Sequence, residues 1–422
     1  MWILAGVLVV VAIGVAGYAV HQLGKPGNSV NTKAAFQAST PTNTPTTASP
    51  KAISRFSWPF YGGQRSRSRD FVGNANLNPP LRETTSFGGN ALLEFPPAIY
   101  GRDLYFLDGG ATAKKVNMSL KGAHKLIWMT HLGLRSASSP ALDPARQELF
   151  VTVLSTVSSA RTSLDGDLVA LSMKTGKVLW KYVLPSGVGS ESSPIVVGNS
   201  VYFGDSAGTL RSLDVRTGHL NWSLSTNGPI KAGPAYAGGE LFFGTYGGTF
   251  YAVSARSGKT VWSQSPGGQF YSTPAIGFGR VYVGNNNGDA YSFVLKDGTE
   301  AWSHYTGGYA YSGPAVANVK GLGPTVYIGS YTGDLNALNA QTGAVEWQSP
   351  VSGGAISGSA TVINNTVYVS SVYHPGSYGF NAVTGKQVWS FRDGSYTTVV
   401  AQPGAIYVMG LYVIYKFVPA KK

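Results

Sequence analysis

The chain of 422 residues contains no cysteine. This absence excludes disulfide bonds, thiol nucleophiles, thiolate metal sites and lipid attachment through sulfur. Charged residues are also scarce, at 12%, whereas glycine occurs 55 times and aromatic residues make up 12%. Because exposed helix faces are usually rich in Lys and Glu, this balance favours many short strands separated by glycine.

Acidic residues are fewer than basic ones, and the formal net charge is +13. The densest basic stretch is "QRSRSRD" at 64–70, with Arg65, Arg67 and Arg69. So short a stretch, outside any recognisable binding module, does not indicate nucleic-acid binding. Attraction to anionic envelope polymers or lipid headgroups explains the charge equally well.

One long apolar run stands near the start, "WILAGVLVVVAIGVAGYAV" at 2–20. It carries no charge, and as a helix it would cover about 28 Å, close to the apolar thickness of a bilayer. We therefore predict a single-pass transmembrane helix that anchors the protein, over residues 1–23. A cleaved signal peptide with "GYA" (17–19) at its cleavage site is the alternative, although the run lacks a basic start.

Residues 24–54 are rich in Thr, Ser and Pro and hold almost no large apolar side chain. Such a segment cannot bury enough surface to offset its ordering entropy, so we predict a disordered stalk. Lys25 and Lys33 after the apolar run do not favour an exported C-terminus. The stalk favours export, because a tether that holds a large domain away from a membrane suits the extracytoplasmic side. We therefore expect the domain at 55–422 on that side of the cell membrane, periplasmic or at the cell surface.

A short phrase that ends in tryptophan recurs along the rest of the chain. Its first clear copy is "TGKVLW" at 175–180, and the tryptophans of successive copies lie 40 to 45 residues apart. Self-similarity at this period is typical of a propeller or a solenoid. A degenerate copy precedes the six clear ones, and 404–418 holds a last copy without the Gly–Trp strand.

Each copy divides into four short strands. Residues 194–224 read as an inner strand "PIVVG", two alternating strands "SVYFGD" and "TLRSLDV", and an outer strand "HLNWSL". The Thr-Gly pair makes the turn before the outer strand, and the tryptophan then points to the next blade, because one sheet cannot bury both of its faces alone. We predict a structural role at the blade interfaces for Trp128, Trp180, Trp222, Trp262, Trp302, Trp347 and Trp389.

The number of copies predicts an all-β, eight-bladed β-propeller of four-stranded blades. The last copy lacks an outer strand, which would leave a sheet edge open. We expect residues 56–64 to supply it, with Trp58 in place of the missing tryptophan. The ring would then close by joining N- and C-terminal strands.

The repeats read "SSP…VYFG…G…LD…TG…W" and resemble pyrroloquinoline-quinone (PQQ) repeats. The segment "SWPFYGGQRSRSR" (57–69) also resembles the one that precedes the first blade in that family. The resemblance covers about 56–418 and implies an architecture similar to quinoprotein alcohol dehydrogenases and to the outer-membrane assembly scaffold BamB. Because the repeat encodes blade packing, the resemblance implies a fold rather than one activity.

The resemblance also describes a cofactor site to look for. Family quinoproteins hold PQQ on the propeller axis with a disulfide of adjacent cysteines and a Ca²⁺ ion. The disulfide is impossible here, and no positions match the calcium-ligand and catalytic-Asp pattern, so we expect neither PQQ nor calcium as a cofactor. Asp165 and Asp167 read as a hairpin turn, and the six histidines are scattered. We predict no catalytic residue and no metal site.

We expect the binding residues on the face where loops enter the inner strands and surround the axis. The residue three before the inner-strand proline, or its equivalent, varies among blades that otherwise agree: Glu94, Ala137, Glu191, Lys231, Tyr271, Tyr311, Ile356 and Tyr396. Two longer inserts (155–166 and 370–379) should lie over the same face and expose Arg161, Tyr373, His374 and Tyr378. Tyr and Arg suit recognition of peptides or glycans, but these residues could equally plug the channel and cap loops.

The sequence therefore predicts a membrane-tethered, monomeric, non-catalytic propeller that acts as a protein-interaction or ligand-binding scaffold in the cell envelope. Its partner would be an envelope protein or a cell-wall polymer, and nucleic acid is not expected. The missing cysteine makes lipidation impossible and puts a role in outer-membrane assembly in doubt. The alternative is an enzyme, either a degenerate quinoprotein or a glycan-acting enzyme with Glu94 and Glu191 as its carboxylate pair.

Overall fold

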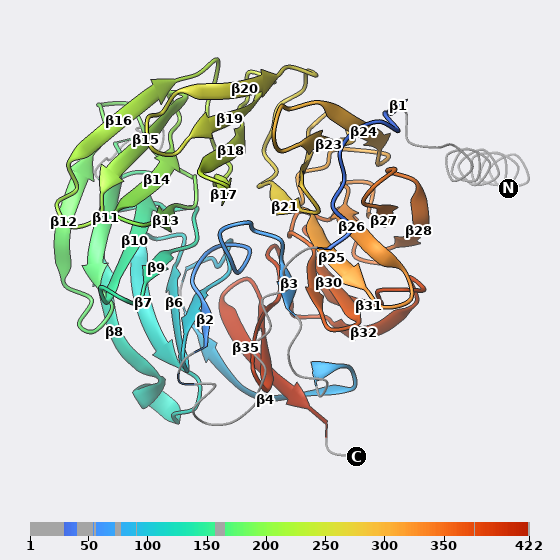
Figure 1. Cartoon of the computed structure of the whole chain (residues 1–422). Coiled ribbons are helices and arrows are strands. Elements are labelled where there is room, and N and C mark those ends of the chain that lie inside the picture. Colours follow the sequence, from blue (N-terminus) through green and yellow to red (C-terminus); the bar gives the residue numbers. More distant parts are fainter. Residues whose placement is uncertain are drawn as a thin grey trace, which may run out of the picture.

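The computed structural model describes residues 29–39, 54, 56–71, 77–89, 91–156, 165–374 and 376–420. Eight separate β-sheets are arranged in a ring around a central axis (Figure 1). Each sheet contains an antiparallel four-stranded blade, so the prediction of an eight-bladed all-β propeller is confirmed. The predicted membrane span at 2–20 lies outside the described residues, and none of the helices within them has the length and apolarity needed to cross a bilayer.

Seven blades follow the chain from inner to outer strand. Blade 1 contains β5 (Ala98–Tyr100), β6 (Asp103–Leu107), β7 (Thr112–Asn117) and, after the short 3-10 helix η2 (Gly122–Lys125), β8 (Leu126–His131). Blade 2 contains β9 (Ala141–Asp143), β10 (Glu148–Val153), β11 (Asp167–Ser172) and β12 (Val178–Val183). Blade 3 contains β13 (Ile195–Val197), β14 (Ser200–Gly204), β15 (Thr209–Asp214) and β16 (Leu220–Ser225). Blade 4 contains β17 (Ala235–Ala237), β18 (Glu240–Gly244), β19 (Phe250–Ser254) and β20 (Thr260–Gln264).

The remaining blades continue this order around the ring. Blade 5 contains β21 (Ala275–Gly277), β22 (Arg280–Gly284), β23 (Asp289–Val294) and β24 (Glu300–Tyr305). Blade 6 contains β25 (Ala315–Val319), β26 (Gly323–Gly329), β27 (Asp334–Asn339) and β28 (Val345–Pro350). Blade 7 contains β29 (Thr361–Ile363), β30 (Thr366–Ser370), β31 (Ser377–Asn381) and β32 (Gln387–Phe391). Blade 8 contains β33 (Val400–Gln402), β34 (Ala405–Met409), β35 (Val413–Pro419) and β4 (Leu81–Gly88).

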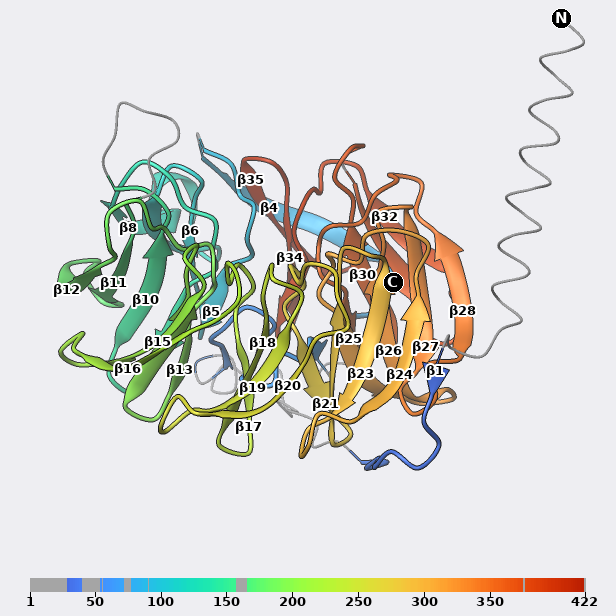
Figure 2. The ribbon, with the colours of Figure 1, turned by 90° about the horizontal axis from the view of Figure 1, so that it is seen from above.

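Blade 8 closes the ring with strands from both ends of the domain. Its outer strand β4 pairs with the C-terminal β35, and Figure 2 shows the two side by side. The expectation that N- and C-terminal strands close the ring is therefore confirmed, but the expected segment, 56–64, is wrong. Trp58 is buried and lies instead in β2 (Ser57–Trp58), which pairs with the inner strand β5. In blade 8 the tryptophan position, opposite Lys416, is held by Thr85.

Six tryptophans link blades 1 to 6 each to the next blade in the same way. In the clearest case, Nε1 of Trp222 donates to the carbonyl of Ala255, 3.0 Å away in blade 4. The glycine of the next Thr-Gly or equivalent turn lies against the indole ring, where a larger residue would clash. Equivalent hydrogen bonds are donated by Trp128, Trp180, Trp262, Trp302 and Trp347.

Residues 56–71, called the axial segment here, pass through the middle of the ring. Besides β2, the segment contains β3 (Asp70–Phe71), which runs parallel to the inner strand β29 of blade 7. Between these strands its carbonyls accept hydrogen bonds from successive blades: from Leu142, Tyr236, Ile276 and Val316. With Arg65 donating to Val196 of blade 3, the segment is hydrogen-bonded to seven of the eight blades.

Residues 29–39, called the N-terminal arm here, fall within the segment for which we expect a disordered stalk. They pack on blade 5 instead, where β1 (Ser29–Val30) adds a fifth strand to the outer edge of the sheet. The arm can be ordered despite its polar composition because Ala34 and Phe36 contact the core of that blade. The other residues of the expected stalk, apart from Ser54, lie outside the described part of the chain.

Candidate functional site

A cavity of about 220 Å³ opens on the axis, at the face where loops enter the inner strands. The predicted variable positions meet here: the cavity is lined by Glu94, Glu191, Lys231, Tyr271, Tyr311 and Tyr396. They come from six different blade-entry loops, so the ring geometry alone brings them together. Their role in binding stays a prediction.

Tyrosines dominate one side of this cavity. The ring of Tyr311 lies 5.2 Å from that of Tyr271 and 5.0 Å from that of Tyr331, measured between centroids. Tyr331 continues the contacts outward to Tyr373, and Tyr373 is 68% exposed. The complete group, called the tyrosine cluster here, consists of Tyr246, Tyr271, Tyr309, Tyr311, Tyr331 and Tyr373. It provides aromatic surface and hydroxyl groups from the cavity wall to the solvent.

Opposite charges meet beside the tyrosines. The Lys231 ammonium lies 3.1 Å from a carboxylate oxygen of Glu191 and 5.0 Å from the centroid of the Tyr246 ring. Loss of surrounding water raises the pKa of Glu94, the Glu191 carboxylate raises it further, and Arg135 opposes both effects. Burial, with the nearby Glu191, also raises the pKa of Tyr271. Tyr271 therefore stays protonated and can donate a hydrogen bond at neutral pH.

The other predicted site residues lie elsewhere. Ile356 is buried and Ala137 is half-buried; neither is among the residues that line the cavity. His374 is exposed next to Tyr373, whereas Tyr378 lies half-buried in β31 against a hydrophobic core cluster. Arg161 lies outside the described residues.

Sequence reasoning missed two tyrosines: Tyr331, which lines the cavity, and Tyr246, which packs against the cavity residues Lys231 and Tyr271. Both stand in the turn between the second and third strands of their blades, in "GTYGG" (244–248) and "GSYTG" (329–333). The equivalent position in blade 3 is Ser206, and in blade 5 it is Asn286. Aligning this turn across the blades would have found them, because it faces the same side of the ring as the entry loops.

Tyr61 of the axial segment also lines the cavity, and sequence reasoning missed it. The Tyr61 hydroxyl lies 2.6 Å from the hydroxyl of Ser359 in blade 7, and its ring packs edge-on against Phe95. The guanidinium of Arg69 lies 5.0 Å from the centroid of the Tyr61 ring. A cation over the ring face holds Tyr61 in place.

Two arginines of the basic stretch at 64–70 lie inside the channel. Arg67 and Arg69 are fully buried and have positive φ angles of 52° and 54°. Arg67 donates to the carbonyls of Pro234 at 2.6 Å and Ser193 at 2.9 Å, and burial lowers its pKa to about 9. These side chains hold blades together and are not available to a nucleic acid.

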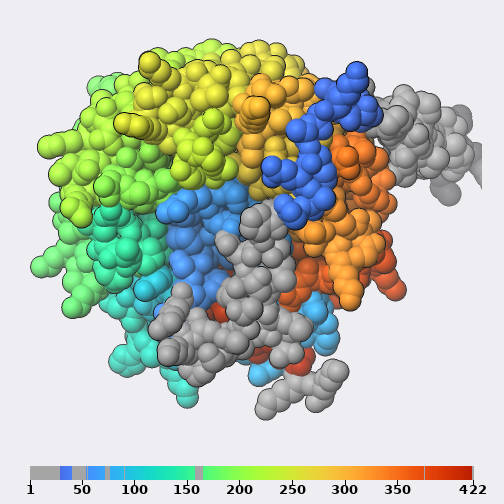
Figure 3. All heavy atoms as spheres, viewed as in Figure 1, coloured from blue at the N-terminus to red at the C-terminus, as the bar shows by residue number. Residues whose placement is uncertain are grey.

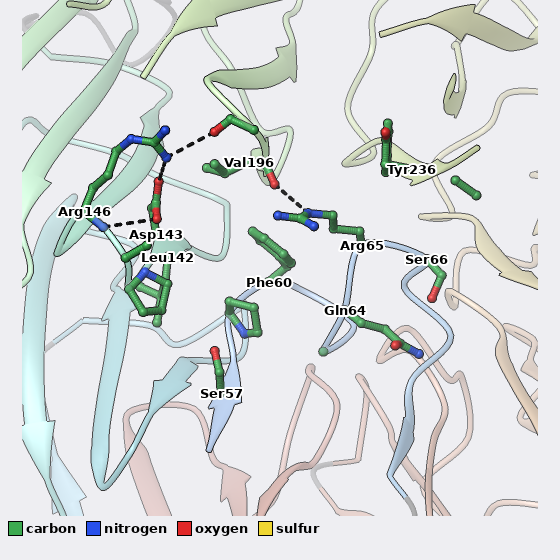
Figure 4. Close-up of a pocket in the computed structure, with 16 residues that line it drawn as sticks. Ser57, Phe60, Gln64, Arg65, Ser66, Leu142, Asp143, Arg146, Val196 and Tyr236 are labelled. Carbon is green, nitrogen blue, oxygen red and sulfur yellow. Dashed lines mark hydrogen bonds and ion pairs between the residues drawn. The ribbon is translucent and has the colours of Figure 1, made fainter. Parts of the chain in front are cut away.

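The opposite mouth of the channel holds a larger cavity of about 830 Å³ (Figure 4). Its wall is formed by the axial segment and the first turns of blades 2 to 4. Arg65 reaches across it to the carbonyl of Val196 at 3.0 Å, while Arg146 is already paired with Asp143 and Asn199. Within the described ranges, no three His, Asp or Glu side chains gather as the ligands of a metal ion would. The expectation of neither PQQ nor calcium stays a prediction.

Eight four-stranded blades, of which blades 1 to 7 are joined in sequence by Trp–Gly contacts, define a propeller of the PQQ-repeat class. The sequence model described as "Outer membrane protein assembly factor BamB" matches residues 121–231 and 206–411. The chain belongs to this family. A search of curated proteins finds no relative by sequence.

Solved structures share the fold at low sequence identity. BamB from Moraxella catarrhalis is 16% identical, with a TM-score of 0.65 over 81% of this chain and 98% of that one. Quinohemoprotein alcohol dehydrogenase from Comamonas testosteroni is 12% identical, with a TM-score of 0.69 over 87% and 81%. A europium-containing methanol dehydrogenase is 13% identical, with a TM-score of 0.69 over 86% and 98%. The fold is therefore common to BamB and to dehydrogenases, and it does not by itself define an activity.

Proposed function

We propose that this protein is a non-catalytic scaffold of the cell envelope that binds a partner protein at the tyrosine cluster. The observation that supports this proposal is the exposed end of the cluster, where Tyr309 is 52% and Tyr373 68% exposed. The exposed parts of these rings bury no surface in the fold, whereas tyrosine is enriched among residues that dominate binding energy. The name of the family, an outer membrane protein assembly factor, supports a role in binding other proteins.

We further propose that the apolar run at 2–20 tethers the propeller to the cell membrane, with the propeller on the extracytoplasmic side. A lipid anchor through cysteine is not available to this chain. The partner we favour is an envelope protein. An extended segment would fit best, because the cluster continues outward from the cavity along adjoining blades.

The test is photo-crosslinking in intact cells, with a crosslinking amino acid in place of Tyr373. The matched control carries it in place of Tyr236, which lines the cavity at the opposite mouth of the channel. We expect one discrete crosslinked species at position 373 that is lost when Tyr309→Ala is added, with an unchanged thermal midpoint. The same species from both positions, or none at 373, would exclude this face as the binding site.

A second candidate is a glycan-cleaving enzyme, which the raised pKa of Glu94 next to Glu191 favours. A protonated carboxyl beside an ionised one is the arrangement that glycoside hydrolysis uses. Release of soluble sugar from cell-wall polymer by the purified protein, abolished by Glu94→Gln, would establish this function. Release at the same rate by the variant, or none from either protein, would leave Glu94 as a binding residue.

A further inference from the structure

The N-terminal arm occupies a groove on blade 5 that has the features of a peptide-binding site. In Figure 3 the arm lies on the surface of the ring as a dark blue strip. Ser29 and Val30 pair antiparallel with Ser303 and Trp302 of the outer strand β24. The N–H of Asn31 extends the pairing by donating to the Ala301 carbonyl at 2.7 Å. An added strand at a sheet edge is a common way for proteins to bind peptides.

A buried arginine receives the next part of the arm. Arg280 is 1% exposed, and its guanidinium donates to the carbonyls of Ala35 at 2.8 Å and Ala34 at 3.1 Å. It also donates to the carbonyl of Gln341 in blade 6 at 2.7 Å. If the arm left, two donors of a buried cation would lose their acceptors, which is unfavourable unless another peptide or water replaces them.

An aromatic side chain completes the contact. Phe36 stacks on Phe278 with centroids 5.7 Å apart, and the Arg280 guanidinium lies 5.0 Å from the Phe36 ring. The N–H of Gln37 donates to the carbonyl of Phe278 at 2.9 Å. The groove therefore fits a peptide that has a short extended strand and an aromatic residue six positions after the strand residue Val30.

We propose that this groove exchanges N-terminal arms between two copies of the protein. Every contact above is made to residues 29–37, and none requires that the arm and the groove belong to one chain. Residues 40–53, which join the arm to the axial segment, can span up to about 50 Å when extended. Exchange of an identical element is a low-cost route to a dimer, because both arrangements make the same contacts.

The first experiment asks whether the groove binds the arm in trans. The probe is a fluorescent peptide of residues 28–39, "NSVNTKAAFQAS", and the target is the full chain with Phe36→Ala, which weakens its own arm but leaves the groove intact. We expect saturable binding, and at least tenfold weaker binding of a peptide with the same Phe36→Ala change. Because this control change lies in the peptide, the fold of the target is unaffected. Equal binding of both peptides, or none, would overturn the proposal.

The second experiment asks whether whole chains exchange arms. The chain has no cysteine, so one introduced cysteine takes one dye. A donor at Ser39→Cys in one population and an acceptor at Lys296→Cys in another, mixed in one vesicle preparation, should give energy transfer. The signal should grow with the number of chains per vesicle and disappear in the Phe36→Ala background. Peptide binding without energy transfer between chains would overturn the exchange. This inference does not depend on the tyrosine cluster.

Discussion

The indole ring of Trp302 lies flat against Gly343 of the next blade. A Cβ added at Gly343 would come within 2.7 Å of the Trp302 ring atom Cδ2. Nε1 of the same indole donates to the Ala340 carbonyl at 3.0 Å, and Trp302 is fully buried. The Gly–Trp phrase repeats because the turn glycine of each of blades 2 to 7 lies against the tryptophan of the blade before it.

Gly343→Ala should therefore destabilise the propeller by about 1–3 kcal/mol, the usual range for overpacking a filled site. The control is Gly354→Ala, because Gly354 has nearly the same φ, 72° against 70°, but nothing within 4 Å of its added Cβ. The difference between the two variants isolates the contact with the indole ring from backbone strain. Equal losses in chemical denaturation would mean that backbone strain alone explains the glycine.

Arg67→Lys should be destabilising although it keeps the charge. The Arg67 guanidinium donates to carbonyls of the axial segment and of blades 3 and 4, and one ammonium group cannot reproduce this planar fork. We expect a loss of about 1–3 kcal/mol for carbonyls left without a donor. Arg65→Lys is the control, since Arg65 is exposed and donates to one carbonyl. Thermal midpoints of the two variants check this.

Asp70 should make stability depend on pH. Its carboxylate oxygen Oδ1 is buried without a hydrogen-bond partner, and burial raises the pKa from 3.8 to about 7. The folded protein holds this proton more tightly than the unfolded chain does, so the group's contribution to stability is present below pH 3.8 and is lost as the pH rises to about 7. Asp70→Asn should remove that loss. The check is the unfolding free energy of the wild type and of Asp70→Asn, measured at about pH 5 and at about pH 8. The same change between the two pH values in both proteins would contradict a raised pKa for Asp70.

Blade 8 should open before the other blades. The ring of Trp389 packs on Phe417 instead of a turn glycine, and Gly122 of blade 1 has no atom within 4 Å of an added Cβ. Both junctions of the closing blade thus lack the Trp–Gly contact. In hydrogen exchange, amides of β4 and β35 should exchange faster than those of β15 and β16 under native conditions. Equal protection from exchange in all blades would contradict this prediction and show that blade 8 is as stable as the blades formed from consecutive strands.

The blades themselves could be predicted from sequence, because the residue pattern within each single repeat indicates its strands, its turns and its interface tryptophan. Residues 194–224 give the expected four strands, β13 to β16, almost to the residue. Closure by an N-terminal strand could be predicted, but β4 could not be identified as that strand, because Thr85 stands at its tryptophan position. The segment that does carry one, around Trp58, pairs with an inner strand instead.

The site residues that could be predicted are those at a repeat position whose residue type varies between aligned blades. Site residues outside the repeats could not be predicted. Glu94, Glu191 and Lys231 stand at one repeat position, so ring geometry brings them together. Tyr61 has no counterpart in any repeat, because it belongs to the axial segment. A side chain that enters a site from outside the repeat leaves no trace in the repeat pattern.

The axial segment also has a consequence for biosynthesis. It precedes every blade in the sequence, yet it is hydrogen-bonded to seven of them. A chain synthesised from its N-terminus therefore contains the axial segment before any of the blades has been made. Each new blade can then form its hydrogen bonds to the axial segment as soon as it is made. The strand β4 must stay unpaired until β35, the last strand, has been synthesised.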